Sequence, residues 1–157
     1  MRALDARRIP YTAFTYDESV HSADGVAPLL GVPASRVFKT LVVFADRDRH
    51  LLVMAPGDRE LDLRLLARSI NAKSAQMAPQ REAERLTGLK VGGISPLALL
   101  DKRFEVYLDA PGAALDELYL NGGQRGVNLR IRVADLLSVT GARVIEATQP
   151  PAQTPAE

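Results

Sequence analysis

Short apolar runs alternate with polar turns along most of this chain, and two of these runs form its clearest motif. Residues 37–45 and 50–55 are apolar and rich in β-branched side chains, and the polar stretch 46–49 joins them. Because this pattern is typical of two strands and their connection, it predicts a β-hairpin. Alternating or apolar runs predict further strands at residues 11–16, 104–108, 117–120, 127–133 and 143–147.

Helical spacing of apolar residues occurs between these strands. A helix over residues 61–70 would place four apolar side chains on one stripe, namely Leu61, Leu65, Leu66 and Ile70. Other helices are predicted from the N-terminus to about residue 9, and over residues 24–31, 79–86 and 134–138. Strands in hairpin order that are interrupted by helices favour an α+β fold with a mixed, mostly antiparallel sheet over a doubly wound fold.

The length of the chain fits one domain. A chain of 157 residues can bury most of its apolar surface without a disulfide or a structural metal. We expect this single domain to occupy residues 1–147, and we expect the proline- and alanine-rich tail, residues 148–157, to be disordered.

Composition and charge argue against several classes of function. Lysine and arginine number 20 against 19 acidic residues, so the net charge of +1 gives no strong field for wrapping duplex DNA. Without cysteine, the chain has no disulfide, thiolate ligand or cysteine nucleophile. No apolar run approaches the roughly 20 residues that cross a membrane. The N-terminus also lacks the apolar core of a signal peptide, so we expect a cytoplasmic protein that binds no membrane.

Two glycine pairs stand between apolar segments where a simple turn would not need them. Val-Gly-Gly-Ile-Ser-Pro occupies residues 91–96, and Asn-Gly-Gly-Gln-Arg-Gly occupies residues 121–126. Adjacent glycines allow main-chain N–H and C=O groups to come within hydrogen-bonding distance of a ligand. The alternative interpretation is that both segments are only connecting loops with turns.

Lys39 is the most informative charged residue, because strand alternation places it in an apolar row. In a strand over residues 37–45, Val37, Leu41 and Val43 would point to the same side as Lys39. A lysine in such a row must snorkel to an edge, pair with an acid, or open into a pocket where a ligand supplies negative charge. Strand patterning alone leaves a structural role and a ligand pocket equally open.

Other polar side chains carry weaker signals. His21 and His50 lie far apart without a carboxylate cluster at ligand spacing, so we predict no metal site. Ser95 precedes a proline and is as readily a capping residue as a ligand contact. Arg125 suits a phosphate oxygen but is equally suited to a solvated turn. Asn128 belongs to the polar row of its strand, which faces either solvent or a site.

Three segments together resemble the YbaK-type family of aminoacyl-tRNA deacylases, relatives of the editing insertion of bacterial prolyl-tRNA synthetase. They are Phe-Lys-Thr-Leu at residues 38–41, Val-Gly-Gly-Ile-Ser-Pro at 91–96 and Gly-Gly-Gln-Arg-Gly at 122–126. The resemblance extends from about residue 9 to residue 147. It implies a barrel-like sheet flanked by helices. It also implies hydrolysis of the ester that joins a wrong amino acid to the 3′ end of a tRNA, without a metal, a cofactor or an enzyme nucleophile.

The same resemblance implies the residues of the site. Lys39 would lie near the terminal adenosine and the scissile ester, and the backbone of Gly92 and Gly93 would line the aminoacyl pocket. The substrate-binding residues are predicted to be Tyr16, Thr40, Ile94, Ser95, Pro96, Asn121, Gly122, Gly123, Arg125 and Asn128.

The substrate is expected to be a small wrong amino acid on tRNA for proline. Cysteine is the first candidate because its own thiol could attack the ester, and alanine is the main competitor, with serine also possible. Asn121 and Asn128 stand where cysteinyl-specific members tend to carry Ser and Asp, which leaves the amino acid open. Expected partners are the tRNA acceptor end and prolyl-tRNA synthetase. The alternatives are a non-catalytic module that binds a tRNA end or an aminoacyl compound, and a purely structural domain.

Overall fold

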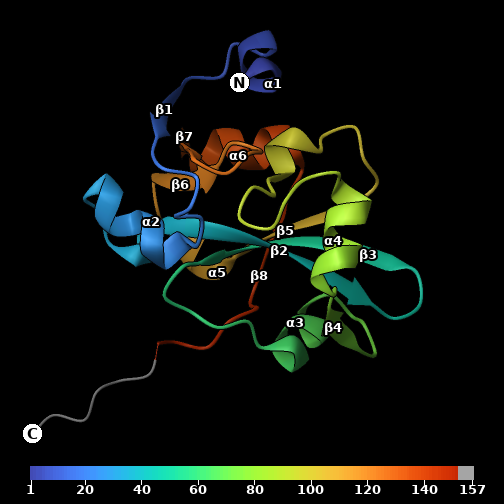
Figure 1. Ribbon diagram of the computed structural model, residues 1–157. Helices are drawn as coiled ribbons and strands as arrows, with labels where there is room; N and C mark the ends of the chain where they lie inside the picture. Colours follow the sequence, from blue (N-terminus) through green and yellow to red (C-terminus); the bar gives the residue numbers. More distant parts are fainter. Residues whose placement is uncertain (152–157) are drawn as a thin grey trace, which may run out of the picture.

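One eight-stranded mixed sheet runs through the middle of the molecule, with helices around it (Figure 1). The computed structural model describes residues 1–151. Its strands are β1 (Tyr11–Thr15), β2 (Val37–Ala45), β3 (Arg49–Pro56), β4 (Ala75–Met77), β5 (Glu105–Asp109), β6 (Glu117–Asn121), β7 (Val127–Arg132) and β8 (Arg143–Ile145). Its α-helices are α1 (Arg2–Ala6), α2 (Ala23–Leu30), α3 (Leu63–Ser69), α4 (Gln80–Thr87), α5 (Ala110–Ala113) and α6 (Val133–Thr140). Two short 3₁₀ helices are η1 (Ala34–Arg36) and η2 (Pro96–Ala98).

The strand order confirms the predicted α+β fold with a mixed sheet. The order is β1-β7-β6-β2-β3-β5-β8, and β4 pairs separately with β2. The antiparallel pairs are β1 with β7, β6 with β7, β2 with β3 and β2 with β4. The parallel pairs are β2 with β6, β3 with β5 and β5 with β8. The predicted hairpin is therefore confirmed as β2 and β3.

β2 has different partners along one of its two edges, and this opens a gap in the sheet. On one edge, β3 pairs with residues 38–45 of β2. On the other edge, β6 pairs with residues 37 and 38, and β4 pairs with residues 43–45. Residues 39–41 have no partner strand on this second edge within the part of the chain that the structure describes. The sheet therefore forks at the position of Lys39.

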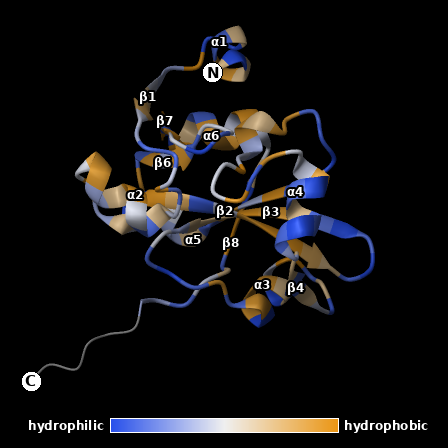
Figure 2. Ribbon diagram, viewed as in Figure 1, coloured by the Kyte–Doolittle hydropathy of each residue, from blue (hydrophilic) through white to orange (hydrophobic). Residues whose placement is uncertain are grey.

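Apolar side chains hold the helices against both faces of the sheet. In Figure 2 the central strands are largely orange, whereas α4 is largely blue. Leu4 of α1 and Leu136 of α6 pack with Leu129 of β7 in one buried cluster. Leu66 of α3 packs with Val53 of β3 in another. These clusters fix the sheet, and with it the fork in β2, on a rigid core.

Most predicted elements are present, with ends shifted by one or a few residues. Gly31 and Gly88 end α2 and α4 in the left-handed conformation, as their positions in the sequence indicated. β4 and α5 were not predicted. β4 has only three residues and no β-branched side chain, and α5 has only four residues, so neither produces a periodic pattern. No helix among residues 1–151 is long and apolar enough to span a membrane.

The first residues of the predicted tail are packed against the domain, which corrects the expected boundary at residue 147. Thr148 is buried and its hydroxyl donates a hydrogen bond to the Asp109 carboxylate. That carboxylate also accepts the Ala147 N–H at 2.8 Å, and Leu61 forms a β-bridge with Thr148. Asp109 thus anchors the end of the domain. Residues 152–157 of the expected disordered tail lie outside the described residues.

We predict that Asp109→Ala lowers the free energy of unfolding by about 2–4 kcal/mol, because it leaves two buried donors without an acceptor. Urea denaturation of the wild type and the variant measures this difference. Thr148→Val is the matched control, since it removes only one of the two hydrogen bonds and should cost about 1 kcal/mol. Equal stability of the wild type and Asp109→Ala would contradict the anchoring role.

Candidate active site

A cavity of about 360 Å³ opens where the sheet forks. β2 contributes residues 37–41 to its wall, and the first glycine loop contributes Val91, Gly92 and Ile94. The segment before and within α2 covers another side, and the strand pair β6–β7 contributes one asparagine from each strand. Segments that are distant in the sequence therefore converge on the gap beside β2.

Lys39 lies in this cavity wall without an acidic partner. Its Nζ atom donates a hydrogen bond of 2.7 Å to the main-chain carbonyl of Arg59. No ion pair involves Lys39 among residues 1–151, although Glu60 also lines the cavity. One carbonyl bond fixes the direction of the ammonium group and leaves its positive charge uncompensated by a carboxylate at salt-bridge distance. The strand pattern allowed Lys39 to snorkel to an edge, to pair with an acid, or to open into a pocket. Its position in the cavity wall agrees with the third of these roles.

The two glycine loops are joined to each other by side-chain hydrogen bonds. Asn121 Nδ2 donates to the carbonyl oxygens of Gly92, at 2.8 Å, and Gln124, at 3.0 Å. The Oδ1 atom of Asn121 accepts the N–H of Gly123 at 2.7 Å. Arg125 Nε donates to the Val91 carbonyl at 2.8 Å. Asn121 and the Nε atom of Arg125 therefore hold the first loop in place.

Gly92 occupies a turn that brings its backbone against His21. The Gly93 N–H donates to the Lys90 carbonyl at 2.7 Å, and Gly92 has φ +89°, as the third residue of a type II turn requires. A Cβ atom at Gly92 would lie 2.5 Å from His21 Nδ1. The Gly92 N–H donates to no other group among the described residues. It is therefore a candidate donor for a negatively charged oxygen in the cavity.

Two polar side-chain atoms in the cavity wall are buried without a hydrogen-bond partner. They are Oγ1 of Thr40 and Oδ1 of Asn128, and Asn128 as a whole is 4% exposed. Burial raises the pKa of the nearby Tyr16 phenol, and the amide of Asn128 partly offsets this rise. Because unsatisfied buried polar atoms are rare in folded proteins, these two are candidates for contact with a polar ligand.

The structure brings together about half of the residues predicted for the site. Those in the cavity wall are Tyr16, Lys39, Thr40, Gly92, Ile94, Asn121 and Asn128. Those outside it are Gly93, Ser95, Pro96, Gly122, Gly123 and Arg125.

Two of the predicted residues that do not line the cavity, Gly93 and Ser95, make contacts that explain them structurally. A Cβ atom at Gly93 would lie 2.9 Å from the backbone nitrogen of Arg125, so Gly93 allows the two loops to touch. Ser95 is fully buried, and its Oγ atom accepts the Leu97 N–H at 3.2 Å as the N-cap of η2. For Ser95 the geometry therefore matches the capping alternative.

Several residues of the cavity wall were not predicted from the sequence to belong to the site. They are His21, Ser22, Asp24, Gly57 and Glu60, among others. His21 directly precedes Ser22, whose hydroxyl accepts the Gly25 N–H and caps α2. The signal available was this capping serine, which fixes the start of the helix and therefore the place of the histidine before it.

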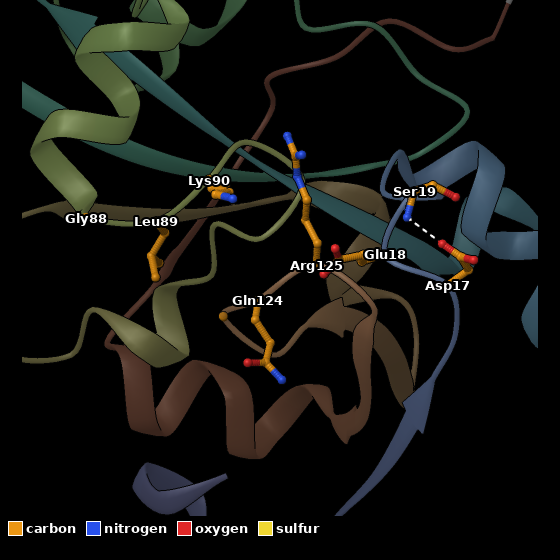
Figure 3. Close-up of a pocket in the computed structure, with 9 residues that line it drawn as sticks. Asp17, Glu18, Ser19, Gly88, Leu89, Lys90, Gln124 and Arg125 are labelled. Carbon is orange, nitrogen blue, oxygen red and sulfur yellow. Dashed lines mark hydrogen bonds between the residues drawn. The ribbon is translucent and has the colours of Figure 1, made fainter.

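A second cavity of about 630 Å³ adjoins the first (Figure 3). Its wall contains Gly123 and Arg125 of the second glycine loop, which were predicted as substrate-binding residues. The segment 17–19 and the segment 88–90 complete the wall. Residues 16 and 91 line the first cavity, and residues 17 and 90, which are next to them in the chain, line the second. The two cavities therefore adjoin each other at two separate segments.

We predict that activity survives removal of divalent cations. Residues 1–151 contain no group of three or more His, Cys, Asp or Glu side chains that could hold a metal ion. Dialysis against a strong chelator, followed by a deacylation assay, tests this prediction. Loss of activity that one divalent cation specifically restores would contradict it.

Comparisons with known proteins connect this geometry to a family. The family model described as "Aminoacyl-tRNA editing domain" matches residues 17–139. EbsC of Enterococcus faecalis, named as a candidate Cys-tRNA(Pro)/Cys-tRNA(Cys) deacylase, is 31% identical over 150 residues, which are 94% of this chain and 91% of EbsC. A proline–tRNA ligase of Sulfurihydrogenibium sp. is 34% identical over 104 residues, which are 66% of this chain but only 17% of the ligase.

A solved structure has the same fold. The crystal structure of the protein APE2540 superposes with a TM-score of 0.86 at 26% identity, covering 94% of this chain and 97% of that protein. The family match covers most of the chain and includes all residues of β2, both glycine loops and α2. The chain therefore belongs to the aminoacyl-tRNA editing domain family, the YbaK-type deacylases that its sequence resembles.

Proposed function

We propose that this protein hydrolyses the ester of mischarged tRNA for proline and accepts a small amino acid in the cavity beside β2. The observation that supports the proposal is one cavity of about 360 Å³ whose wall contains Lys39, Gly92, Thr40 and Asn128. Among the described residues, the Gly92 N–H, Thr40 Oγ1 and Asn128 Oδ1 have no hydrogen-bond partner. An ester needs few catalytic groups if its carbonyl is held among oriented donors.

In this proposal, Lys39 and Gly92 stabilise the negative charge that develops during attack on the ester carbonyl. The ammonium group of Lys39 supplies a positive charge in a partly enclosed space, where electrostatic interactions are stronger than in water. The Gly92 N–H supplies a fixed dipole. The attacking atom, a water oxygen or the cysteinyl sulfur, bonds to the carbonyl carbon and gives up its proton, while the bond to the terminal ribose oxygen breaks and that oxygen takes up a proton. Attack by water gives the free amino acid directly, whereas attack by the sulfur gives a cyclic thioester that water then opens to free cysteine.

Cysteine is the first proposed amino acid, and the name of EbsC agrees with this choice. A cysteinyl thiol carries its own nucleophile, which would replace the cysteine nucleophile that this chain lacks. Alanyl- and seryl-tRNA are the alternatives, for which a bound water must attack. A cytoplasmic location and a partnership with prolyl-tRNA synthetase also stay predictions. A non-catalytic aminoacyl-binding module is the competing function, but the family assignment favours the deacylase.

Release of free amino acid from a panel of charged tRNAs tests the proposal. The panel contains tRNA for proline charged with cysteine, alanine, serine or proline, and cysteine tRNA charged with cysteine. We expect the fastest release from cysteinyl-tRNA(Pro). Faster release from alanyl- or seryl-tRNA(Pro) would replace the thiol-assisted route by a water-driven one, and the absence of release from every member would refute the deacylase function.

A further inference from the structure

We propose that the second cavity binds the cytidine that precedes the terminal adenosine of the tRNA, an inference that rests on the proposed function. Every tRNA ends in cytidine, cytidine and adenosine, and the adenosine carries the amino acid. If the aminoacyl group enters the cavity beside β2, the preceding nucleotide must lie within one nucleotide length of it. The second cavity, of about 630 Å³, adjoins the first and has the larger volume.

The chain itself sets the two cavities side by side. Tyr16 lines the first and Asp17 the second, and likewise Val91 lines the first and Lys90 the second. The bond between Arg125 Nε and the Val91 carbonyl ties the wall of one cavity to the wall of the other. A ligand that spans both cavities would therefore meet a preformed surface, which lowers the entropy cost of binding.

Two positively charged side chains in the wall of the second cavity, Lys90 and Arg125, have N–H groups without hydrogen-bond partners among the described residues. In Figure 3 the side chain of Arg125 extends from the second glycine loop, with Lys90 on the neighbouring loop. Arg125 uses only its Nε atom in the bond to Val91, so both terminal nitrogens are without a partner among the described residues. Lys90 forms no ion pair or side-chain hydrogen bond within residues 1–151. Such donors suit the phosphate that links the last two nucleotides.

Two carboxylates in the cavity wall, those of Asp17 and Glu18, distinguish this cavity from a simple anion site. The Ser19 N–H donates to the Asp17 carboxylate at 2.9 Å, shown by the dashed line in Figure 3, and lowers the pKa of that carboxyl group. Glu18 has no partner side chain among the described residues. A free phosphate would be repelled by these groups. Cytosine instead has an exocyclic amino group that can donate a hydrogen bond to a carboxylate, whereas uracil has an oxygen at the same position and cannot donate there.

The test compares cysteinyl esters of adenosine, of the dinucleotide CpA and of the dinucleotide UpA, with spontaneous hydrolysis subtracted. For the wild type we expect kcat/KM at least tenfold higher for cysteinyl-CpA than for cysteinyl-adenosine, and a smaller gain for cysteinyl-UpA. Lys90→Ala should reduce the gain for both dinucleotides. Glu18→Gln should reduce the difference between CpA and UpA. Both variants should hydrolyse cysteinyl-adenosine at the wild-type rate, and Lys102→Ala, an exposed lysine outside both cavities, should behave as the wild type.

Two results would contradict the proposed cytidine site and leave the proposed function intact. One is an equal kcat/KM for cysteinyl-adenosine, cysteinyl-CpA and cysteinyl-UpA. The other is turnover of cysteinyl-tRNA(Pro) with no turnover of any of the three short esters, since the cytidine then contributes no measurable gain. If neither the charged tRNA nor any short ester is hydrolysed, the proposed function itself fails.

Discussion

Replacing Lys39 by alanine should reduce deacylation of mischarged tRNA by about a hundredfold or more, the scale expected when a principal electrostatic group is removed from a transition state. The ammonium group is the only lysine or arginine charge in the wall of the cavity beside β2, within the part of the chain that is described. Its loss should lower kcat/KM with little change in stability, because Lys39 makes one hydrogen bond, to the Arg59 carbonyl. Single-turnover rates and thermal unfolding of the variant measure the two effects.

Two variants separate the role of this charge from a general effect of lysine removal. Lys39→Arg should also be impaired, because a wide planar guanidinium does not replace a compact ammonium in a confined space. Lys102→Ala, which removes an exposed lysine outside the cavity, should keep the wild-type rate. Near-normal turnover by Lys39→Ala would remove Lys39 from the proposed mechanism.

Replacing Gly92 by alanine should also abolish most of the activity, again by about a hundredfold or more, because a displacement of about 1 Å in a site can cost this much. The added methyl group would lie 2.5 Å from His21 Nδ1 and 2.6 Å from its Cβ atom. The ring or the turn must move, and both form part of the cavity wall. The positive φ of +89° adds a strain of about 1–2 kcal/mol to the folded state.

Gly141→Ala is the matched control for the strain at Gly92. Gly141 has φ +68°, but an added Cβ atom there meets nothing within 4 Å. The Gly141→Ala variant should therefore lose about as much stability as Gly92→Ala and keep the wild-type activity. In the Gly92→Ala background, His21→Gly should restore part of the rate, since it removes the Nδ1, Cβ and Cγ atoms that the methyl group would meet. If Gly92→Ala and Gly141→Ala have equal activity per folded molecule, the turn at Gly92 is only structural.

The sequence was sufficient to predict the sheet but not the fork in it. The hairpin formed by β2 and β3 and the glycines that end α2 and α4 follow from local patterns, because strand alternation and left-handed caps are encoded in a few neighbouring residues. The fork depends on where β6 and β4 end along β2, and these are contacts between distant segments. For the same reason, strand patterning alone could not choose between a snorkelling Lys39 and a lysine in a cavity.

The structure places some of the predicted site residues in the cavity wall and others outside it, and contacts between distant segments decide which. The first glycine loop does line a cavity, but only through Gly92 of the pair, because Gly93 faces the second loop. Asn121 lies in the wall, yet its amide is occupied by the two loops, whereas Asn128 on the adjacent strand keeps an unpaired oxygen. No sequence pattern separates these two asparagines. His21 was not predicted because a single histidine in a polar loop carries no signal of its own, and the capping Ser22 beside it fixes only the start of α2.

The most direct measurement is the initial rate of amino acid release from cysteinyl-tRNA(Pro) and from correctly charged prolyl-tRNA(Pro), at equal concentrations and with Lys39→Ala assayed beside the wild type. We expect rapid release of cysteine by the wild type, little release of proline, and release of cysteine about a hundredfold slower by the variant. If prolyl-tRNA(Pro) is the better substrate, the protein does not proofread. If Lys39→Ala is as fast as the wild type, the cavity beside β2 does not use Lys39 as proposed.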